Sequence, residues 1–228
     1  MIASASHTTE NTTYHHSVTR LDVTMDGGEL TLGTGPAGQV GIHRVLTWTS
    51  AKPRITERWA GDTLTVTTSC PRQSDCDVNY TADIPAGTSV SASTGGGTIT
   101  ADGLAGAQSL RSNGGDIQIA GARGPMTVWT KGGAVTGTGL TSDQAQVISG
   151  GGPVTLGFTI APGQITATTK GGNISIAVPR VAAGTSGYQV QASTDGGARR
   201  VQVAQDSSGQ HLIKLHSGGG DLAVSYSD

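Results

Sequence analysis

One stretch decides the fold: LRSNGGDIQI at residues 110–119, in which a Gly-Gly pair separates two short segments of alternating apolar and polar residues. Alternation with a period of two is typical of a β-strand that has one buried face. We therefore expect Leu110 to point inward before the pair, and Ile117 and Ile119 to point inward after it. The stretch predicts two short strands joined by a bend at glycine.

The same unit recurs through the C-terminal two-thirds of the chain. Its glycine clusters end at positions 97, 115, 133, 152, 172, 197 and 220, at intervals of 18, 18, 19, 20, 25 and 23 residues. Four residues before the last two glycines the side chain is always apolar, and only Gly137 and Arg199 interrupt the apolar positions that follow the pair. A repeat of this length is typical of a solenoid, whose coils bury their inner faces by stacking.

These patterns predict the fold class. We expect an all-β protein, a single-stranded β-solenoid or β-helix-like stack of about seven Gly-Gly repeat coils with an N-terminal antiparallel β cap. No segment has the periodicity of a helix of three turns. Glycine is expected at the bends because the chain turns there at positive φ or kinks within a strand, and because the corners of neighbouring coils stack too closely for side chains.

The regularity of the repeats divides the chain into three parts. Residues 1–16 are predicted to be a flexible N-terminal segment, residues 17–82 an irregular β cap or meander with a cysteine pair, and residues 83–228 the β-solenoid repeats. We expect residues 17–228 to form one continuous domain. The cap includes a weaker eighth copy of the Gly-Gly motif. The longer, more irregular last two units and the final strand at 221–226 are expected to close the opposite end.

Charge and hydropathy exclude two classes of partner. The net charge is -2, and no Lys/Arg cluster exceeds Arg199-Arg200, so the basic surface of a nucleic-acid-binding protein is missing. No stretch reaches the roughly 18 apolar residues of a membrane span. Residues 1–6 lack the basic start and apolar middle of a signal peptide, so the chain is expected to be cytoplasmic or to have lost a leader.

The two cysteines bear on the cellular compartment. Cys70 and Cys76 flank five residues of a tight polar turn that can close a small disulfide loop between two strands. An oxidised pair favours an extracytoplasmic protein. The alternative is two reduced thiols in a cytosolic protein. A zinc site is not expected, because two cysteines at this spacing lack the further cysteine or nearby histidine that zinc would need.

The sequence offers no catalytic or metal-binding constellation. Polysaccharide lyases and hydrolases need carboxylates on adjacent coils, whereas Asp116 and Asp221 are five coils apart and are expected to be solvated residues at strand starts. Calcium-binding solenoids need an aspartate in every turn, a position that is mostly uncharged here. His15-His16 is expected to be a flexible surface pair. We predict no enzyme activity, no metal and no cofactor.

One outward position is a candidate binding surface. Three residues before the glycine pair, successive coils carry Arg111, Trp129 and Ile148, which predict a small contiguous patch on the surface. Exposed aromatic and apolar groups on a flat sheet are typical of partner or sugar binding. The alternative is that the N-terminal meander, with Trp48 and Trp59, folds over these residues.

The repeated Ser/Thr-x-Gly-Gly-x-Ile/Val unit, as in residues 112–117 and 169–174, resembles the DUF4097 family of bacterial proteins regarded as adhesins. So does the order of an irregular β region, a close cysteine pair and the segment 83–88 leading into the repeats, which is common in actinobacterial members. The resemblance covers about residues 18–226. It implies a β-solenoid that is exported or anchored at the cell envelope, and it carries over no catalytic residue.

Three functional hypotheses follow from these observations. The first is a non-catalytic extracytoplasmic module for adhesion or interaction at the bacterial cell envelope, whose partner is an unknown protein or glycan, or a second copy of the chain. The alternative is a self-assembling structural scaffold like the cytoplasmic bactofilins, which predicts uncapped ends and reduced cysteines. A carbohydrate-active β-helix enzyme is the third, and it requires a groove with two or more acids.

Overall fold

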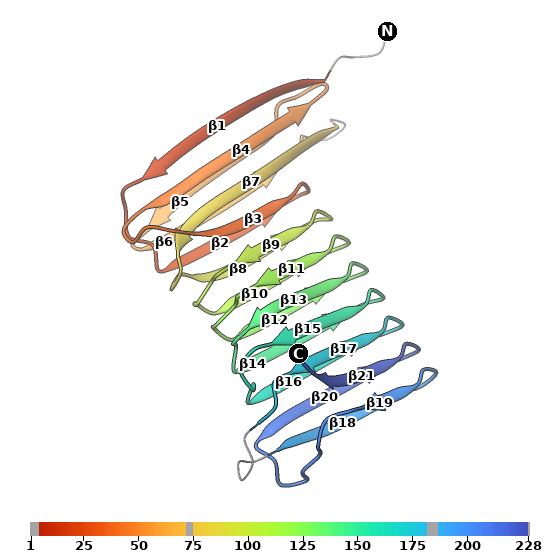
Figure 1. The fold of residues 1–228 in the computed structure, drawn as a ribbon. Coiled ribbons are helices and arrows are strands. Elements are labelled where there is room, and N and C mark those ends of the chain that lie inside the picture. The colour runs from red at the N-terminus through yellow and green to blue at the C-terminus, as the bar shows by residue number, and fades with distance from the viewer. Residues whose placement is uncertain (1–4, 72–74, 182–186, 228) are drawn as a thin grey trace.

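The computed structural model describes residues 5–71, 75–181 and 187–227, and these residues form strands and no helix. The strands belong to two sheets, one of eleven strands and one of ten. Figure 1 shows the sheets running side by side along a rod, with β1 at one end and β18 and β19 at the other. The prediction of an all-β protein is confirmed for the described residues.

Most neighbouring strands within each sheet are parallel. In spatial order, sheet A contains β1 (Ser6–Tyr14), β4 (Val40–Trp48), β7 (Cys76–Pro85), β3 (Leu30–Gly35), β9 (Ile99–Asp102), β11 (Ile117–Ala120), β13 (Val135–Leu140), β15 (Val154–Phe158), β17 (Ile174–Val178), β21 (Leu222–Tyr226) and β19 (Arg199–Val201). Sheet B contains β5 (Arg54–Ala60), β6 (Thr63–Ser69), β2 (Arg20–Met25), β8 (Ser89–Thr94), β10 (Gln108–Ser112), β12 (Met126–Thr130), β14 (Gln144–Ser149), β16 (Gln164–Thr169), β20 (His211–Ser217) and β18 (Tyr188–Thr194).

Each Gly-Gly unit contributes one strand to each sheet. The chain leaves β10 in sheet B, bends at the glycine pair, forms β11 in sheet A, and returns through a second corner to β12 in sheet B. Equivalent residues of consecutive units pair in parallel register, so that Leu110 lies beside Val128 and Ile117 beside Val135. The units therefore stack as turns do in a β-helix.

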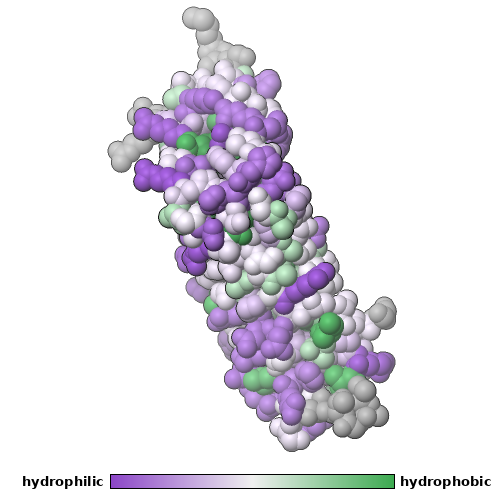
Figure 2. All heavy atoms as spheres, turned by 90° about the vertical axis from the view of Figure 1, so that its left-hand side faces the viewer, coloured by the Kyte–Doolittle hydropathy of each residue, from purple (hydrophilic) through white to green (hydrophobic). Residues whose placement is uncertain are grey.

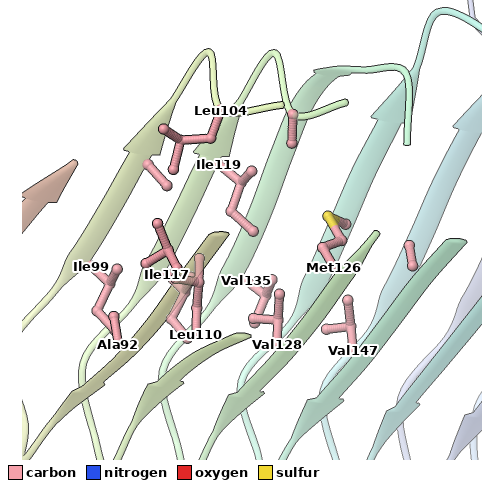
Figure 3. Close-up of a cluster of buried hydrophobic side chains, with 14 of the residues drawn as sticks. Ala92, Ile99, Leu104, Leu110, Ile117, Ile119, Met126, Val128, Val135 and Val147 are labelled. Carbon is pink, nitrogen blue, oxygen red and sulfur yellow. The ribbon is translucent and has the colours of Figure 1, made fainter. Parts of the chain in front are cut away.

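The core lies between the two sheets. Side chains from sheet B face side chains from sheet A along the length of the stack, as Figure 3 shows for the units around Leu110 and Ile117. Leu110 and Ile117 are 1% and 0% exposed, and the residues that directly follow them, Arg111 and Gln118, are exposed. The period of two in the sequence thus separates the core from the surface, because successive side chains of a strand point to opposite faces.

Both kinds of corner bring neighbouring backbones too close for a side chain. A Cβ on Gly115 at the first corner would lie 2.3 Å from the carbonyl oxygen of Gly97, and one on Gly124 at the second corner would lie 2.2 Å from that of Gly106. These contacts do not depend on φ, which is not in the left-handed region at either glycine. The second corner has an additional reason for glycine, because Gly103 and Gly121 have φ of 71° and 59°.

A ladder of buried hydroxyl groups joins the glycine bends. Thr130 Oγ1 accepts a hydrogen bond from the Gly133 amide at 3.1 Å and donates one to the Gly115 carbonyl of the preceding coil at 3.1 Å. Equivalent pairs of hydrogen bonds are made by Thr94, Ser112, Thr169, Thr194 and Ser217. The Ser/Thr of the repeat therefore provides hydrogen-bond partners for two backbone groups, the amide of its own bend and a carbonyl of the adjacent coil.

At the C-terminal end, the spatial order of the units differs from their order in the sequence. The last unit, β20 and β21, packs directly on β16 and β17, and the unit formed by β18 and β19 lies outermost. The last two units do lie at this end, as the sequence predicts, but the expectation that the final strand closes it is wrong, because β21 lies between β17 and β19. Arg199 explains the exchange: it occupies an inward position that only the end coil leaves open to water.

The N-terminal end is also stacked out of sequence order. The weaker eighth copy, β2 and β3, packs in parallel on β8 and β9, while the meander strands β4 to β7 lie outside it. The sequence predicts a flexible segment over residues 1–16, whereas the structure places residues 6–14 in β1, paired antiparallel with β4. Four threonines with β propensity, in two adjacent pairs at 8–9 and 12–13, favour a strand that the low hydrophobicity of this segment concealed.

Candidate functional site

The structure brings the three predicted patch residues together on the outer face of sheet B. Arg111 on β10 pairs in register with Trp129 on β12, which pairs with Ile148 on β14. The guanidinium carbon of Arg111 lies 3.9 Å from the centroid of the Trp129 ring. Arg111 is exposed, Trp129 is half-buried, and Ile148 is 38% exposed. We call these three residues the Trp129 patch.

The N-terminal meander does not cover the Trp129 patch. Trp48 lies on β4 in sheet A, and Trp59 lies on β5 at the edge of sheet B. Four strands, β10, β8, β2 and β6, separate β5 from β12. Trp59 instead packs against Tyr14, with ring centroids 5.5 Å apart. Burial of the Trp129 patch by the meander is therefore excluded.

Hydroxyl and amide side chains surround the Trp129 patch. The outward residues of the neighbouring strands are Ser109, Thr127, Gln146, Thr166 and Thr168. A shallow depression continues this surface toward the C-terminal end and is lined by Thr166, Thr168, Gln191, Ser193, Lys214 and His216 among others. Figure 2 shows that hydrophilic and near-neutral residues predominate on one long face of the rod, with only scattered hydrophobic ones.

A second cluster, which the sequence analysis missed, lies between the sheets at the N-terminal end. Glu57 on β5 accepts hydrogen bonds from the hydroxyls of Tyr14 and Tyr80 and from the guanidinium of Arg44. The Glu57 side chain is 9% exposed and that of Arg44 is 17% exposed. We call these four residues the Glu57 network. Its members are far apart in the sequence, so no local motif marks it.

The electrostatics of the Glu57 network keep both tyrosines protonated. The hydrogen bond to Glu57 and partial burial raise the pKa of Tyr14 to about 12. Burial and the negative charge of Glu57 raise the pKa of Tyr80 as well. Three donors are thus directed at one carboxylate, whose side chain is only 9% exposed. The arrangement suits a structural cap.

Glu10 extends this cap toward solvent. It accepts hydrogen bonds from Arg44 Nε and Lys52 Nζ, both at 2.9 Å. The hydrogen bond from Lys52 is the main cause that lowers the pKa of Glu10, and Arg44 adds to it. Three cations of the cap form ion pairs with acids. Arg20 pairs with Asp22, Arg44 pairs with Glu10 and Glu57, and Lys52 pairs with Glu10.

Two acids considered for catalysis have structural partners instead. Asp116 accepts a hydrogen bond from the amide of Ala134 at 2.8 Å, and Asp221 accepts one from the amide of Ala198 at 2.8 Å. Each carboxylate therefore binds a strand start in the neighbouring coil. The sequence predicts that the two aspartates are only solvated, whereas in the structure each also accepts a backbone hydrogen bond. The topology keeps them on different parts of the stack.

Cys70 and Cys76 form a disulfide, with Cα atoms 5.7 Å apart. It joins the end of β6 in sheet B to the start of β7 in sheet A. The sequence prediction of a disulfide between two strands is thus met.

The described residues contain no group of three or more His, Cys, Asp or Glu placed to hold a metal ion. Over the same residues, no helix has the length and apolar character that a bilayer crossing requires. His16 packs against Trp59, with ring centroids 4.5 Å apart, and so differs from the flexible pair that the sequence predicts.

Comparison with known proteins finds no protein-family model and no curated protein that matches the chain. Among solved structures, the chain is similar to a "putative adhesin" from Bacteroides fragilis NCTC 9343, at 11% identity and a TM-score of 0.49, over 96% of this chain and 97% of that one. It is also similar to a "putative cell adhesion protein" from Clostridium sporogenes ATCC 15579, at 11% identity and a TM-score of 0.37, over 97% and 100%.

A third similar structure is a "putative lipid binding protein" from Parabacteroides distasonis ATCC 8503, at 11% identity and a TM-score of 0.27, over 97% of each chain. Identities and TM-scores this low do not establish a family or a function for this chain.

Proposed function

We propose that the chain is a non-catalytic, extracytoplasmic β-solenoid module for adhesion or interaction at the bacterial cell envelope. The resemblance of its Gly-Gly repeat to actinobacterial DUF4097 proteins supports this proposal. The observation that carries it is the Trp129 patch, in which an exposed Ile148 and a half-buried Trp129 lie side by side on a hydroxyl-rich sheet that the meander does not cover. The rigid stack holds these groups at fixed spacing, which suits recognition rather than catalysis.

A binding assay tests this proposal. Purified protein is mixed with cell envelopes of the organism that makes it, and the bound fraction is measured after sedimentation. We expect the double variant Trp129→Ala/Ile148→Ala to lose most of the binding, since large hot-spot side chains dominate such interfaces. The control is Thr136→Ala/Thr155→Ala, which alters exposed residues of sheet A. Equal binding by all three proteins would contradict a role for the patch.

The compartment is a separate part of the proposal. The Cys70–Cys76 disulfide supports an oxidising environment, where such bonds persist. Intact mass measured after thiol alkylation in whole cells, together with cell fractionation, tests it. We expect both cysteines to be protected and the protein to lie outside the cytoplasmic membrane. Alkylation of both thiols in a cytosolic fraction would overturn the extracytoplasmic location.

One observation favours self-assembly as a second candidate function. Among the strands that the structure describes, β1 pairs only with β4, so its nine residues present an edge that can pair with another chain. Light scattering across a range of concentrations distinguishes this function, because end-to-end assembly predicts a mass that grows with concentration. The disulfide argues against the cytoplasmic, bactofilin-like form of this hypothesis.

A further inference from the structure

The outer face of sheet B is depleted of negative charge over most of its length. Seven adjacent strands, β8, β10, β12, β14, β16, β20 and β18, contain no Asp or Glu at all. The whole chain nevertheless has more acids than bases, 16 against 14. The acids are therefore segregated away from this face, which has a local excess of positive charge.

The cations on this face have no acidic partner. Arg111 and Lys214 form no ion pair with any residue that the structure describes. Arg111 lies over the Trp129 ring, with its guanidinium carbon 3.9 Å from the ring centroid, and it is exposed, so its N–H groups can donate to a carboxylate. Lys214 is exposed between Thr166 and Gln191. Arg44 and Lys52 in the cap, by contrast, are held by carboxylates.

The two cations are spaced along one direction of the stack. β10 and β20 are four strand positions apart in sheet B, so Arg111 and Lys214 are separated by about 19 Å along the rod. Trp129, Ile148 and Thr168 follow Arg111 in register, and this row leads to His216 on β20. Lys214 lies two residues before His216 on the same strand, in register with Thr166. Cationic ends with an aromatic and hydroxyl-bearing centre fit an extended polymer that has acidic groups and sugar rings.

We infer that the outer face of sheet B binds an acidic polysaccharide that lies across the strands. Arg111 and Lys214 contact its acidic groups, Ile148 and the part of Trp129 that Arg111 leaves exposed pack against its sugar rings, and the hydroxyl and amide side chains bind its hydroxyls. This inference rests on the proposed function and names the class of ligand. It would be overturned without loss of that function if the partner at the same face were a protein.

The test uses short oligogalacturonides and their methyl esters, which have the same backbone with and without free carboxylates. Calorimetric titration at low salt is expected to give binding of the acid form and at least about tenfold weaker binding of the ester, because the ester offers no charge to the two cations. Arg111→Ala/Lys214→Ala is expected to weaken binding of the acid form by about five- to tenfold.

The matched control is Lys131→Ala/Lys170→Ala, which removes the same charge from two exposed residues of the glycine turns. It is expected to bind as the wild type does, within about twofold. Equal loss in both double variants would show that only net charge matters and would overturn the site.

Two further outcomes overturn the inference. One is equal affinity for the acid and its ester, and the other is equal affinity for polyglutamate, which has carboxylates but no sugar rings. The envelope assay separates this failure from failure of the proposed function. If Arg111→Ala/Lys214→Ala binds envelopes as the wild type does, the acidic ligand is wrong and the module remains. If the wild type binds no envelope, the proposed function falls as well.

Discussion

The N-terminal cap and the Gly-Gly stack enclose the same two-sheet core with different chemistry. In the stack, each inner face is apolar and is covered by coils on both sides, as for Leu110 and Ile117. In the cap, the space between β1, β4, β7 and β5 contains Glu57, Arg44 and two tyrosines. Antiparallel pairing replaces parallel stacking there.

This difference follows from the position of each region. An internal coil has neighbours on both sides, so apolar burial stabilises it and close backbone contact is required. The end of the rod has a neighbour on one side only, so its inner face lies near water. A charged group can be tolerated there provided that it is paired and hydrogen-bonded. The stack thus depends on glycine, and the cap depends on ion pairs.

The sharpest way to break the stack is to fill a glycine bend. A Cβ on Gly133 would lie 2.1 Å from the Gly115 carbonyl oxygen, whereas a Cβ on Gly132 would have nothing within 4 Å. We expect Gly133→Ala to lower the free energy of unfolding by at least about 3 kcal/mol, since the clash involves backbone that cannot move aside. Urea denaturation followed by circular dichroism measures the change.

Gly132→Ala is the matched control for that experiment. Neither glycine has φ in the left-handed region, so the two variants differ mainly in the space available to the new methyl group. We expect Gly132→Ala to change stability by less than about 1 kcal/mol. Equal losses would contradict close approach as the reason for glycine at the second position of the pair.

The cap is tested by removing the charge of Glu57. Glu57→Gln leaves Arg44 without its least exposed partner and removes an acceptor from the two tyrosines. We expect the opening free energy of the cap to fall, because Arg44 loses a charged partner inside the cap. The loss is expected to be limited to about 2 kcal/mol, since Arg44 keeps its ion pair with Glu10. Hydrogen exchange should accelerate in β1, β4 and β5 and remain unchanged in β11, β13 and β15, which lie within the stack.

Glu10→Gln serves as the control for the cap. The Glu10 side chain is 32% exposed, so its ion pairs with Arg44 and Lys52 are screened by water. A loss below about 1 kcal/mol is expected. Faster exchange throughout the stack in Glu57→Gln would mean that cap and stack unfold as one unit, and the distinction between the two regions would be lost.

The smallest expected effect is a pH dependence that belongs to the cap. The pKa of Tyr14 is raised from 10.0 to about 12, so the folded protein holds this proton more tightly than the unfolded chain. The resulting stabilisation is complete below about pH 10 and is lost as the pH rises toward about 12. Melting temperatures measured across this interval should fall less steeply in Tyr14→Phe than in the wild type. Parallel curves would contradict the role of the Tyr14 hydroxyl.

Much of the candidate binding surface could be predicted from the sequence. Arg111, Trp129 and Ile148 occupy one position of units that differ by 18 and 19 residues, and equal spacing brings equal positions into register. Lys214 could not be added in this way. In the sequence, residues 188–201 stand between β16 and the unit that contains Lys214. In the structure, β20 with Lys214 packs directly on β16. Arg199 at an inward position was the one signal of this exchange.

The sequence by itself determined the strand period, the inner and outer faces, the glycine bends and the cysteine pair. These features depend on residues that are close in the chain, through side-chain alternation and backbone geometry. Only the tertiary structure decided the order of coils at both ends, the strand β1 and the Glu57 network. The physical reason is that every coil presents similar backbone hydrogen-bonding edges, so the order of stacking depends on long-range packing and on which inner face tolerates water.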